Sequence, residues 1–387
     1  MTLRLPVYMD HHATTPVDPR VLDEMLPYFT DQFGNASSID HIYGAKALEA
    51  VEESRERVAE TINARPEEII FTSGATEADN LALQGVAGAY ASKGRHIITC
   101  TTEHKAILDT CKHLQELGWK VTYVPVDRYG TIDLVELENS ITSETVLISV
   151  MLANNEVGTI APAKEIREIA KEHGVLFHSD AAQAVGHIHV DVEEMGVDLM
   201  SMSAHKVYGP KGIGALYIRR HNPRVGLAPT TYGGGQERGL RSGTYNVPGI
   251  VGMGKAFEIA AKSIGEESRR LSAWTSKMKA SFETIDGAEQ NGHPFNKLPH
   301  NLNTFFPGVE SKALIQLLAR HVAISAGSAC TTEEVEPSHV ILALGYSHER
   351  AHSSVRFGLG RFNTEEEVRY VIDSLMEAVK HLHKIKV

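Results

Sequence analysis

The chain has 387 residues, of which 42% are hydrophobic and 22% charged, and its net charge is -11. This length exceeds the size at which one hydrophobic core usually stops growing, so we expect a large domain and a smaller one. The acidic balance argues against direct binding of nucleic acid, because a protein that contacts a phosphate backbone needs a basic surface.

The N-terminus and the cysteine content both indicate the cytoplasm. The segment MTLRLPVYMDHHATTP lacks the apolar run of a signal peptide, and no stretch of the sequence approaches the roughly 18 apolar residues of a membrane span. Three cysteines, Cys100, Cys111 and Cys330, are too few for a disulfide framework. For Cys100 and Cys111, which fall in a predicted strand and a predicted helix, we expect buried packing roles.

Apolar runs alternate with helical patterns from about residue 68 to residue 220. This alternation predicts βαβ units, a mostly parallel seven-stranded sheet and a large domain over residues 15–255. Ligands bind at the carboxyl ends of strands in such sheets, so we expect the active site there. The predicted strands lie in EEIIFTSG, HIITCTTEH, KVTYVPVD, TVLISVML, VLFHSD, VDLMSMS and GIGALYIRR.

A long helical pattern begins near Val247 and runs through GMGKAFEIAAKSIGEESRRLSAWTSKMKASF. It lacks strand alternation and predicts a spine between two domains. The rest of the chain offers a few strands and helices, ending in a helix from Thr364 with cations at its end. We therefore expect a smaller α+β domain made of residues 1–14 and 256–387.

The segment TSGATEADN has the form of a phosphate-binding turn. Thr72 ends a predicted strand, Gly74 allows the backbone to turn, and Thr76 opens a helix whose free N–H groups would face the edge of the sheet. The alternative is an ordinary capped turn between a strand and a helix.

Three further polar residues follow predicted strands. Lys206, in SMSAHKVYGPKG, could be desolvated in a cleft, which would lower its pKa and allow a Schiff base with an aldehyde cofactor. Asp180 could pair with a protonated pyridine nitrogen, and His104 could stack on the ring or transfer protons. Taken singly, they are better explained as a surface lysine and two structural polar groups.

Taken together, the motifs resemble those of cysteine desulfurases, which are pyridoxal-phosphate enzymes of fold type I in the class V aminotransferase group. The resemblance covers nearly the whole chain, and its cysteine segment is similar to the NifS/IscS type. The motifs are SGATEADN, TEHKA, NNEVG, HSDAAQAVG, SAHKVYGPKGIGALY, GGGQERGLRSGT, SAGSACTT and HSSVRFGLGRF.

The resemblance implies a role for each site residue. Lys206 would form the Schiff base with pyridoxal 5'-phosphate, Asp180 would contact the pyridine nitrogen, Gln183 the ring hydroxyl, and His104 would stack on the ring. The residues implied for the phosphate are Ala75, Thr76, Ser203, His205 and a Thr244 donated by the second subunit of a homodimer. Those implied for the substrate carboxylate are Asn155 and Arg356.

The implied reaction converts L-cysteine to L-alanine and places the sulfur on Cys330 as a persulfide. The acceptor would be an iron–sulfur scaffold protein or a carrier for tRNA thiolation. Because small residues surround Cys330, we expect a mobile loop over about residues 326–336. No resident metal is expected, since His11, His12, His187 and His189 match no zinc spacing, although Cys330 could be a transient iron–sulfur ligand.

Two alternatives remain open at this point. One is another pyridoxal-phosphate enzyme of the same fold, such as a selenocysteine lyase or an aminotransferase, in which Cys330 is incidental. The other is a non-catalytic partner that keeps the fold to bind proteins, although Lys206 and Asp180 argue against it. Relatives of this type usually extend beyond the last helix into a tail that helps dock the scaffold, whereas this sequence ends at HLHKIKV, so the mode of docking stays open.

Overall fold

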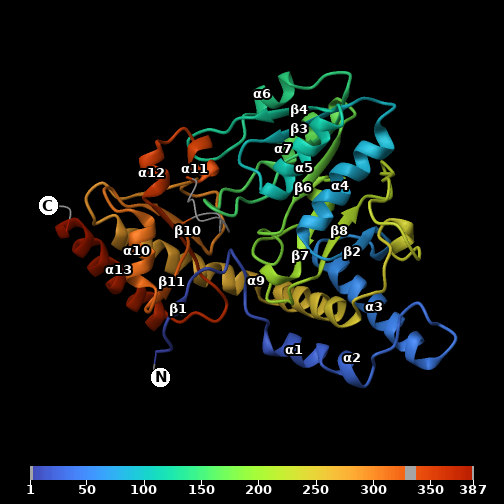
Figure 1. Cartoon of the computed structure of the whole chain (residues 1–387), viewed down its shortest axis with the longest axis horizontal. Coiled ribbons are helices and arrows are strands. Elements are labelled where there is room, and N and C mark those ends of the chain that lie inside the picture. The colour runs from blue at the N-terminus through green and yellow to red at the C-terminus, as the bar shows by residue number, and fades with distance from the viewer. Residues whose placement is uncertain (1–2, 327–336, 386–387) are drawn as a thin grey trace.

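The computed structural model describes residues 3–326 and 337–385. A seven-stranded sheet with the order β2-β8-β7-β6-β5-β3-β4 forms its centre (Figure 1). The pairs β3–β4, β3–β5, β5–β6 and β6–β7 are parallel, while β8 runs antiparallel to β7 and β2. The predicted mostly parallel sheet is therefore confirmed. Its strands are β2 (Ile69–Thr72), β3 (His96–Cys100), β4 (Lys120–Val124), β5 (Thr145–Ser149), β6 (Leu176–Asp180), β7 (Leu199–Ser203) and β8 (Gly214–Ile218).

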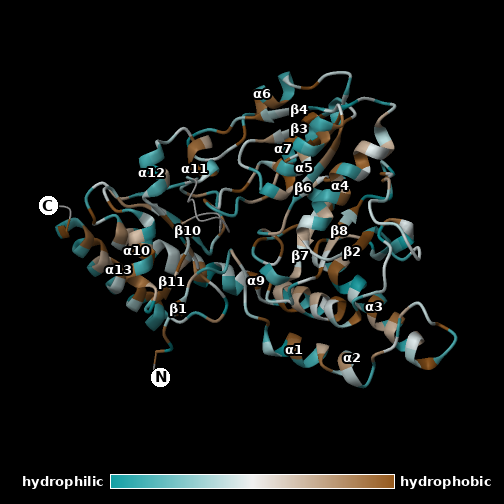
Figure 2. Cartoon of the chain, in the orientation of Figure 1, coloured by the Kyte–Doolittle hydropathy of each residue, from teal (hydrophilic) through white to brown (hydrophobic). Residues whose placement is uncertain are grey.

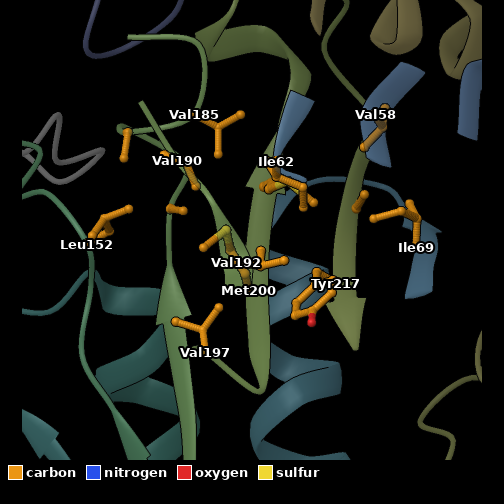
Figure 3. Packing of buried hydrophobic residues seen from close by; sticks show 14 of the residues in the cluster. Val58, Ile62, Ile69, Leu152, Val185, Val190, Val192, Val197, Met200 and Tyr217 are labelled. Atoms are coloured by element: carbon orange, nitrogen blue, oxygen red, sulfur yellow. The ribbon is translucent and has the colours of Figure 1, made fainter. Parts of the chain in front are cut away.

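Helices cover both faces of this sheet, which explains why six of its seven strands are buried along their whole length. Helices α4 (Ala75–Tyr90) and α5 (Lys105–Glu116) pack on one face. Helices α3 (Ile42–Thr61), α7 (Ala163–Glu172) and α9 (Val247–Phe282) pack on the other. Figure 3 shows part of this second layer, where Val58 and Ile62 lie near Ile69 and Tyr217. The shorter helices are α1 (Pro19–Met25), α2 (Pro27–Thr30), α6 (Leu134–Asn139) and α8 (Val192–Met195).

A second hydrophobic core lies around two small sheets. One has the order β12-β10-β9, and the other pairs β1 with β11 in parallel. The N-terminal strand thus lies beside a strand formed more than 300 residues later, at Val322. Its elements are β1 (Val7–Tyr8), β9 (Glu289–Gln290), β10 (Asn301–Phe305), α10 (Ser311–Leu318), β11 (Val322–Ala323), β12 (Ser354–Gly358) and α13 (Glu365–Ile385). Helices α11 (His339–Ala343) and α12 (His348–His352) belong to a separate small cluster that also contains Val157.

Helix α9 belongs to both cores, as expected of the predicted spine. Its N-terminal half buries Val251 and Phe257 in the core of the large sheet, and its C-terminal half buries Met278 and Phe282 in the second core. Figure 1 shows it running from one group of elements to the other. The domain limits at residues 14/15 and 255/256 stay a prediction.

Among residues 3–326 and 337–385, no helix is both long and apolar enough to cross a membrane.

Candidate functional site

A cavity of about 730 Å³ opens where β2, β6 and β7 end. This is the carboxyl edge of the parallel strands, where the sequence predicted the site. Arg356 from β12 closes the cavity from the second core. The predicted residues that line it are Ala75, Thr76, His104, Asn155, Asp180, Gln183, Ser203, His205, Lys206 and Arg356.

Lys206 lies in a single 3₁₀ turn, Ala204–Lys206, directly after β7. Its Nζ donates hydrogen bonds to the carbonyl oxygens of His12 and Ala13, the latter at 2.8 Å. Burial and the nearby Arg356 guanidinium lower the pKa of Lys206 to about 8, despite opposing contributions from Asp10 and Asp180. A lysine with this pKa supplies a neutral, nucleophilic amine near neutral pH far more readily than an exposed one.

The first turn of α4 forms one end of the cavity, at Ala75 and Thr76. No side chain caps this helix, so the N–H groups and the positive end of its dipole can serve an anion. The turn is tight, because a Cβ on Gly214 of β8 would lie 2.6 Å from the Cα of Gly74. Glycine at position 214 therefore brings the helix N-terminus close to the sheet.

Asp180 lies at the end of β6 and is 6% exposed. Its Oδ1 accepts the N–H of Ala182 at 2.9 Å. Burial raises the pKa of Asp180 above its usual range, against the hydrogen bond from the N–H of Ala182 and the nearby amine of Lys206. A cationic group in the cavity would be stabilised by this carboxylate and would in turn favour its ionised form.

A second carboxyl group, Asp79 of α4, also lines the cavity and is buried. Burial, followed by the charge of Asp180, raises the pKa of Asp79 well above its usual range. The like charge of Asp180 therefore adds to burial in favouring the protonated form of Asp79.

His104 is the N-cap of α5, and its Nδ1 accepts the N–H of Ala106 at 3.1 Å. In the neutral ring the proton is then on Nε2. His104 thus combines exposure to the cavity with a fixed tautomer, which is what proton transfer at a bound ligand requires.

Arg356 is 3% exposed and already paired within the protein. It contacts Oδ1 of Asp10 at 2.8 Å through Nη2 and donates to the carbonyl oxygen of Asn155 at 2.8 Å through Nη1. Its buried Nε has no hydrogen-bond partner among the described residues. Each Nη atom also carries a second N–H that these two contacts do not use, so the guanidinium has donors left for an anionic substrate while Asp10 holds it in place.

Two predicted residues are not placed in this cavity. Cys330, together with the loop predicted to be mobile, lies outside the described residues. Thr244 is exposed and does not line the cavity, and its role in a second subunit stays a prediction. Cys100 and Cys111 are buried as predicted, and burial raises their pKa values to about 11 and about 12.

Sequence reasoning missed several polar residues of the cavity wall. They are His12, Thr14, Asp79, Lys105, Glu156, Lys211 and His339. For His12 a signal was present, because DHHATTP places polar residues directly after the short apolar run of β1. Thr14 lies in the same stretch, and Asp79, Lys105, Glu156 and Lys211 fall within the motifs quoted above, so only His339 carried no sequence signal.

The lining residues fit pyridoxal phosphate on three grounds. A lysine with a lowered pKa can react with the aldehyde, a buried carboxyl group matches a protonated ring nitrogen, and an uncapped helix N-terminus matches the phosphate. All three groups share one cavity.

Comparison with known proteins gives the same picture. Residues 7–371 match the family model described as aminotransferase class-V. The chain is 52% identical to "Cysteine desulfurase IscS" of Anaeromyxobacter dehalogenans over 99% of this chain and 95% of that protein, and 50% identical to the protein of the same name from Dechloromonas aromatica over 100% and 95%.

Solved structures with similar folds include a "NIFS-LIKE PROTEIN", with a TM-score of 0.91 and 41% identity over 97% of this chain and 100% of that one. Another is "SspA in complex with cysteine", with a TM-score of 0.81 and 38% identity over 92% and 100%. The family model spans nearly the whole chain, and the first relative shares half its residues. This chain therefore belongs to the aminotransferase class-V family.

Proposed function

We propose that this protein is a pyridoxal-phosphate-dependent cysteine desulfurase. L-cysteine and the thiol of Cys330 would give L-alanine and a persulfide on Cys330, so that one sulfur atom moves and no external oxidant is needed. The observation that carries the proposal is a lysine of lowered pKa sharing a cavity with an arginine that has a donor to spare. The relatives named cysteine desulfurase, and the solved relative in complex with cysteine, support this substrate.

Pyridoxal phosphate, when bound, would supply an electron sink for the bonds at the α-carbon of the substrate. Asp180 would hold the ring nitrogen in its protonated form, and the first turn of α4 with Ser203 and His205 would hold the phosphate. Arg356 and Asn155 would bind the substrate carboxylate.

Two side chains are suited to moving protons. The amine of Lys206 is predominantly neutral above pH 8 and would remove the α-proton of the substrate. His104 would deliver a proton from Nε2, since its Nδ1 is occupied by the N–H of Ala106. The thiols of Cys100 and Cys111 are poor candidates for sulfur transfer, because burial keeps them protonated.

The decisive experiment follows sulfur and carbon separately. Wild-type protein given L-cysteine should form alanine and carry a persulfide that mass spectrometry places on Cys330. Cys330→Ser should bind cysteine with the same change in cofactor absorption but release almost no sulfide. Cys111→Ser serves as the matched control and should behave like the wild type. A persulfide on Cys100 or Cys111, or full alanine formation by Cys330→Ser, would show that the nucleophile is wrong.

We also propose a homodimer in which Thr244 reaches the phosphate site of the second subunit. Thr244 is exposed, and its loop is held beside the first turn of α4 by the 2.8 Å ion pair of Arg241 with Glu77. Large apolar side chains are also exposed between α1 and the start of α3, and Figure 2 shows hydrophobic residues along this outer edge. They are Leu22, Leu26, Phe29, Phe33, Ile39, Ile42 and Tyr43.

Mixing two impaired variants tests this sharing. Thr244→Ala should weaken cofactor retention about tenfold, the value of one hydrogen bond to a charged group. Heterodimers of Thr244→Ala with Lys206→Ala should recover activity, because one of the two sites regains both residues. Absence of rescue despite proven subunit exchange would contradict a shared site.

The sulfur acceptor and the cytoplasmic location are further parts of the proposal. An iron–sulfur scaffold protein or a tRNA-thiolation carrier would take the sulfur. Free, buried thiols at Cys100 and Cys111 favour a reducing compartment. Incubation with ³⁵S-labelled cysteine and each candidate acceptor, followed by tracking of the label, distinguishes the acceptors.

A further inference from the structure

A histidine that sequence reasoning did not use, His12, contacts two cavity residues at once. Its Nδ1 lies 2.9 Å from Oε1 of Gln183, and the Nε2 of Gln183 donates to the carbonyl oxygen of His12 at 3.0 Å. The same carbonyl oxygen accepts a hydrogen bond from Nζ of Lys206. His12 is 1% exposed, so all these contacts are shielded from water.

The proton on the His12 ring can be located from its neighbours. The Nδ2 of Asn301 in β10 lies 3.1 Å from Nε2 of His12, and it also donates to the carbonyl oxygen of Glu156 at 3.1 Å. A carbonyl oxygen only accepts, so this atom of Asn301 is the amide nitrogen and Nε2 of His12 must accept from it. The proton of neutral His12 is therefore on Nδ1 and is donated to Gln183.

The same contacts determine the orientation of the Gln183 side-chain amide. Its oxygen accepts from His12 Nδ1, and one hydrogen of its Nε2 is given to the His12 carbonyl oxygen. A second hydrogen on Nε2 remains as a donor for a ligand. Rotation of this amide by 180° would set its nitrogen against the Nδ1–H and its oxygen against a carbonyl oxygen, two repulsive contacts.

Neighbouring residues also keep the His12 ring neutral and fix its orientation. It stacks on His300 with centroids 4.4 Å apart, and His300 stacks on His187 at 4.1 Å. Burial, and then the positive charge of Arg356, lower the pKa of His12 well below its usual range, with His187 and Lys206 adding to the effect and the bond to Gln183 opposing it. His187 donates from Nε2 to the carbonyl oxygen of Lys206 at 2.9 Å. The two outer residues of the stack therefore both contact Lys206, His187 at its carbonyl oxygen and His12 at its amine.

Pyridoxal phosphate carries its aldehyde and its ring hydroxyl on adjacent ring carbons. We propose that His12 is a positioning residue for the two protein groups that would meet these neighbouring substituents. Its side chain orients the amide of Gln183 toward the ring hydroxyl, and its carbonyl oxygen holds the amine of Lys206 near the aldehyde. The inference rests on the proposed use of pyridoxal phosphate. Gln183, held in this way, offers an N–H to the ring oxygen and favours the oxyanion form of that oxygen.

Three variants separate orientation from packing. His12→Phe keeps a ring to stack on His300 but removes the Nδ1–H. His12→Asn places an amide N–H near the position of Nδ1 and should restore the bond to Gln183. His300→Phe keeps the stack and touches neither Gln183 nor Lys206 through a hydrogen bond, so it is the matched control.

The measurements are made on full-length protein freed of cofactor and titrated with pyridoxal phosphate. We expect His12→Phe to raise the dissociation constant about tenfold, as for loss of a hydrogen bond to a charged group, and to shift the pH at which the visible absorption of the bound cofactor changes. His12→Asn should stay within about twofold of the wild type, a difference smaller than one neutral hydrogen bond. His300→Phe should leave the absorption unchanged.

Thermal midpoints of the cofactor-free proteins report on folding alone. If His12→Phe lowers the midpoint, the comparison of His12→Asn with the wild type still tests orientation. Wild-type affinity and absorption in His12→Phe, or equal defects in His12→Asn and His12→Phe, would overturn the proposal. A wild-type protein that binds pyridoxal phosphate on Lys206 but yields no alanine from cysteine would instead refute the proposed function and leave this inference standing.

Discussion

Two half-buried lysines, Lys206 and Lys297, can be compared because desolvation lowers the pKa of each to about 8. Both amines donate to carbonyl oxygens, Lys206 to that of Ala13 at 2.8 Å and Lys297 to that of Asn301 at 3.0 Å. Their surroundings differ, since Lys206 lines the 730 Å³ cavity with Asp180 and Arg356, and Lys297 does not line it. Lys297 instead forms an isolated antiparallel bridge with Thr159.

The comparison shows that a lowered pKa does not by itself identify a reactive lysine. Desolvation acts on any buried amine, whether or not a ligand can reach it. Lys206 differs from Lys297 because it lines a cavity that a ligand can enter, together with the charged side chains of Asp180 and Arg356.

Removing the amine of Lys206 should have the largest effect. Lys206→Ala should lose covalent cofactor and lower the rate of alanine formation by about a thousandfold or more, as expected when a nucleophile and base are lost. Borohydride reduction followed by peptide mapping should find the cofactor on Lys206 of the wild type. Lys297→Ala is the matched control and should keep both the covalent cofactor and the rate of alanine formation. Cofactor attached to Lys297 would contradict the assignment of Lys206.

Arg356 is the cation that accompanies Lys206 but not Lys297. Arg356→Gln should raise KM for cysteine about a hundredfold, because two charge-assisted hydrogen bonds are lost. It should also raise the pKa of Lys206, since Arg356 is the largest lowering influence after burial. Arg350→Gln removes another buried arginine, one outside the cavity, and should leave KM unchanged. Equal effects of the two substitutions would contradict a substrate role for Arg356.

The lowered pKa of Lys206 predicts a pH profile for cofactor capture. Only the neutral amine attacks the aldehyde, so the rate at which cofactor-free protein takes up pyridoxal phosphate should rise about tenfold per pH unit below pH 8 and level off above it. An ordinary lysine would keep accelerating to about pH 10.4. Stopped-flow absorption at several pH values checks this, and a profile still rising at pH 10 would show that Lys206 is not desolvated.

Lys297→Met should have the smallest effect, on stability only. At pH 7 the folded protein holds a buried charge at Lys297, so methionine of similar length should raise the free energy of unfolding by about 1 kcal/mol. Between about pH 8 and pH 10.5 the unfolded wild-type chain binds more protons than the folded one, so wild-type stability rises and the advantage of the variant shrinks. Urea titrations at pH 7 and pH 9.5 measure it, and an advantage that grew with pH would contradict the lowered pKa.

The sequence predicted the sheet and the cavity residues that follow strands, because a buried parallel strand is a continuous apolar run and its end is marked by polar residues. Helix α3 is absent from the predicted elements although Ala47, Val51 and Val58 recur at helical spacing, so that omission was avoidable. The network of His12 could not be predicted, since Gln183 and Asn301 lie 171 and 289 residues away. The equal pKa values of Lys206 and Lys297 likewise depend on burial that no local pattern specifies.

The pairing of β1 with β11, and the bridge from Asp10 to Gly358, have a consequence for synthesis in the cell. His12 and Ala13, which hold the amine of Lys206, are made more than 300 residues before β11, the strand that pairs with β1. Contacts of such long sequence separation form late and slowly. A ribosome must therefore release the chain through β11 and β12 before the nascent protein could retain the proposed pyridoxal phosphate, and products truncated before β11 should emerge colourless.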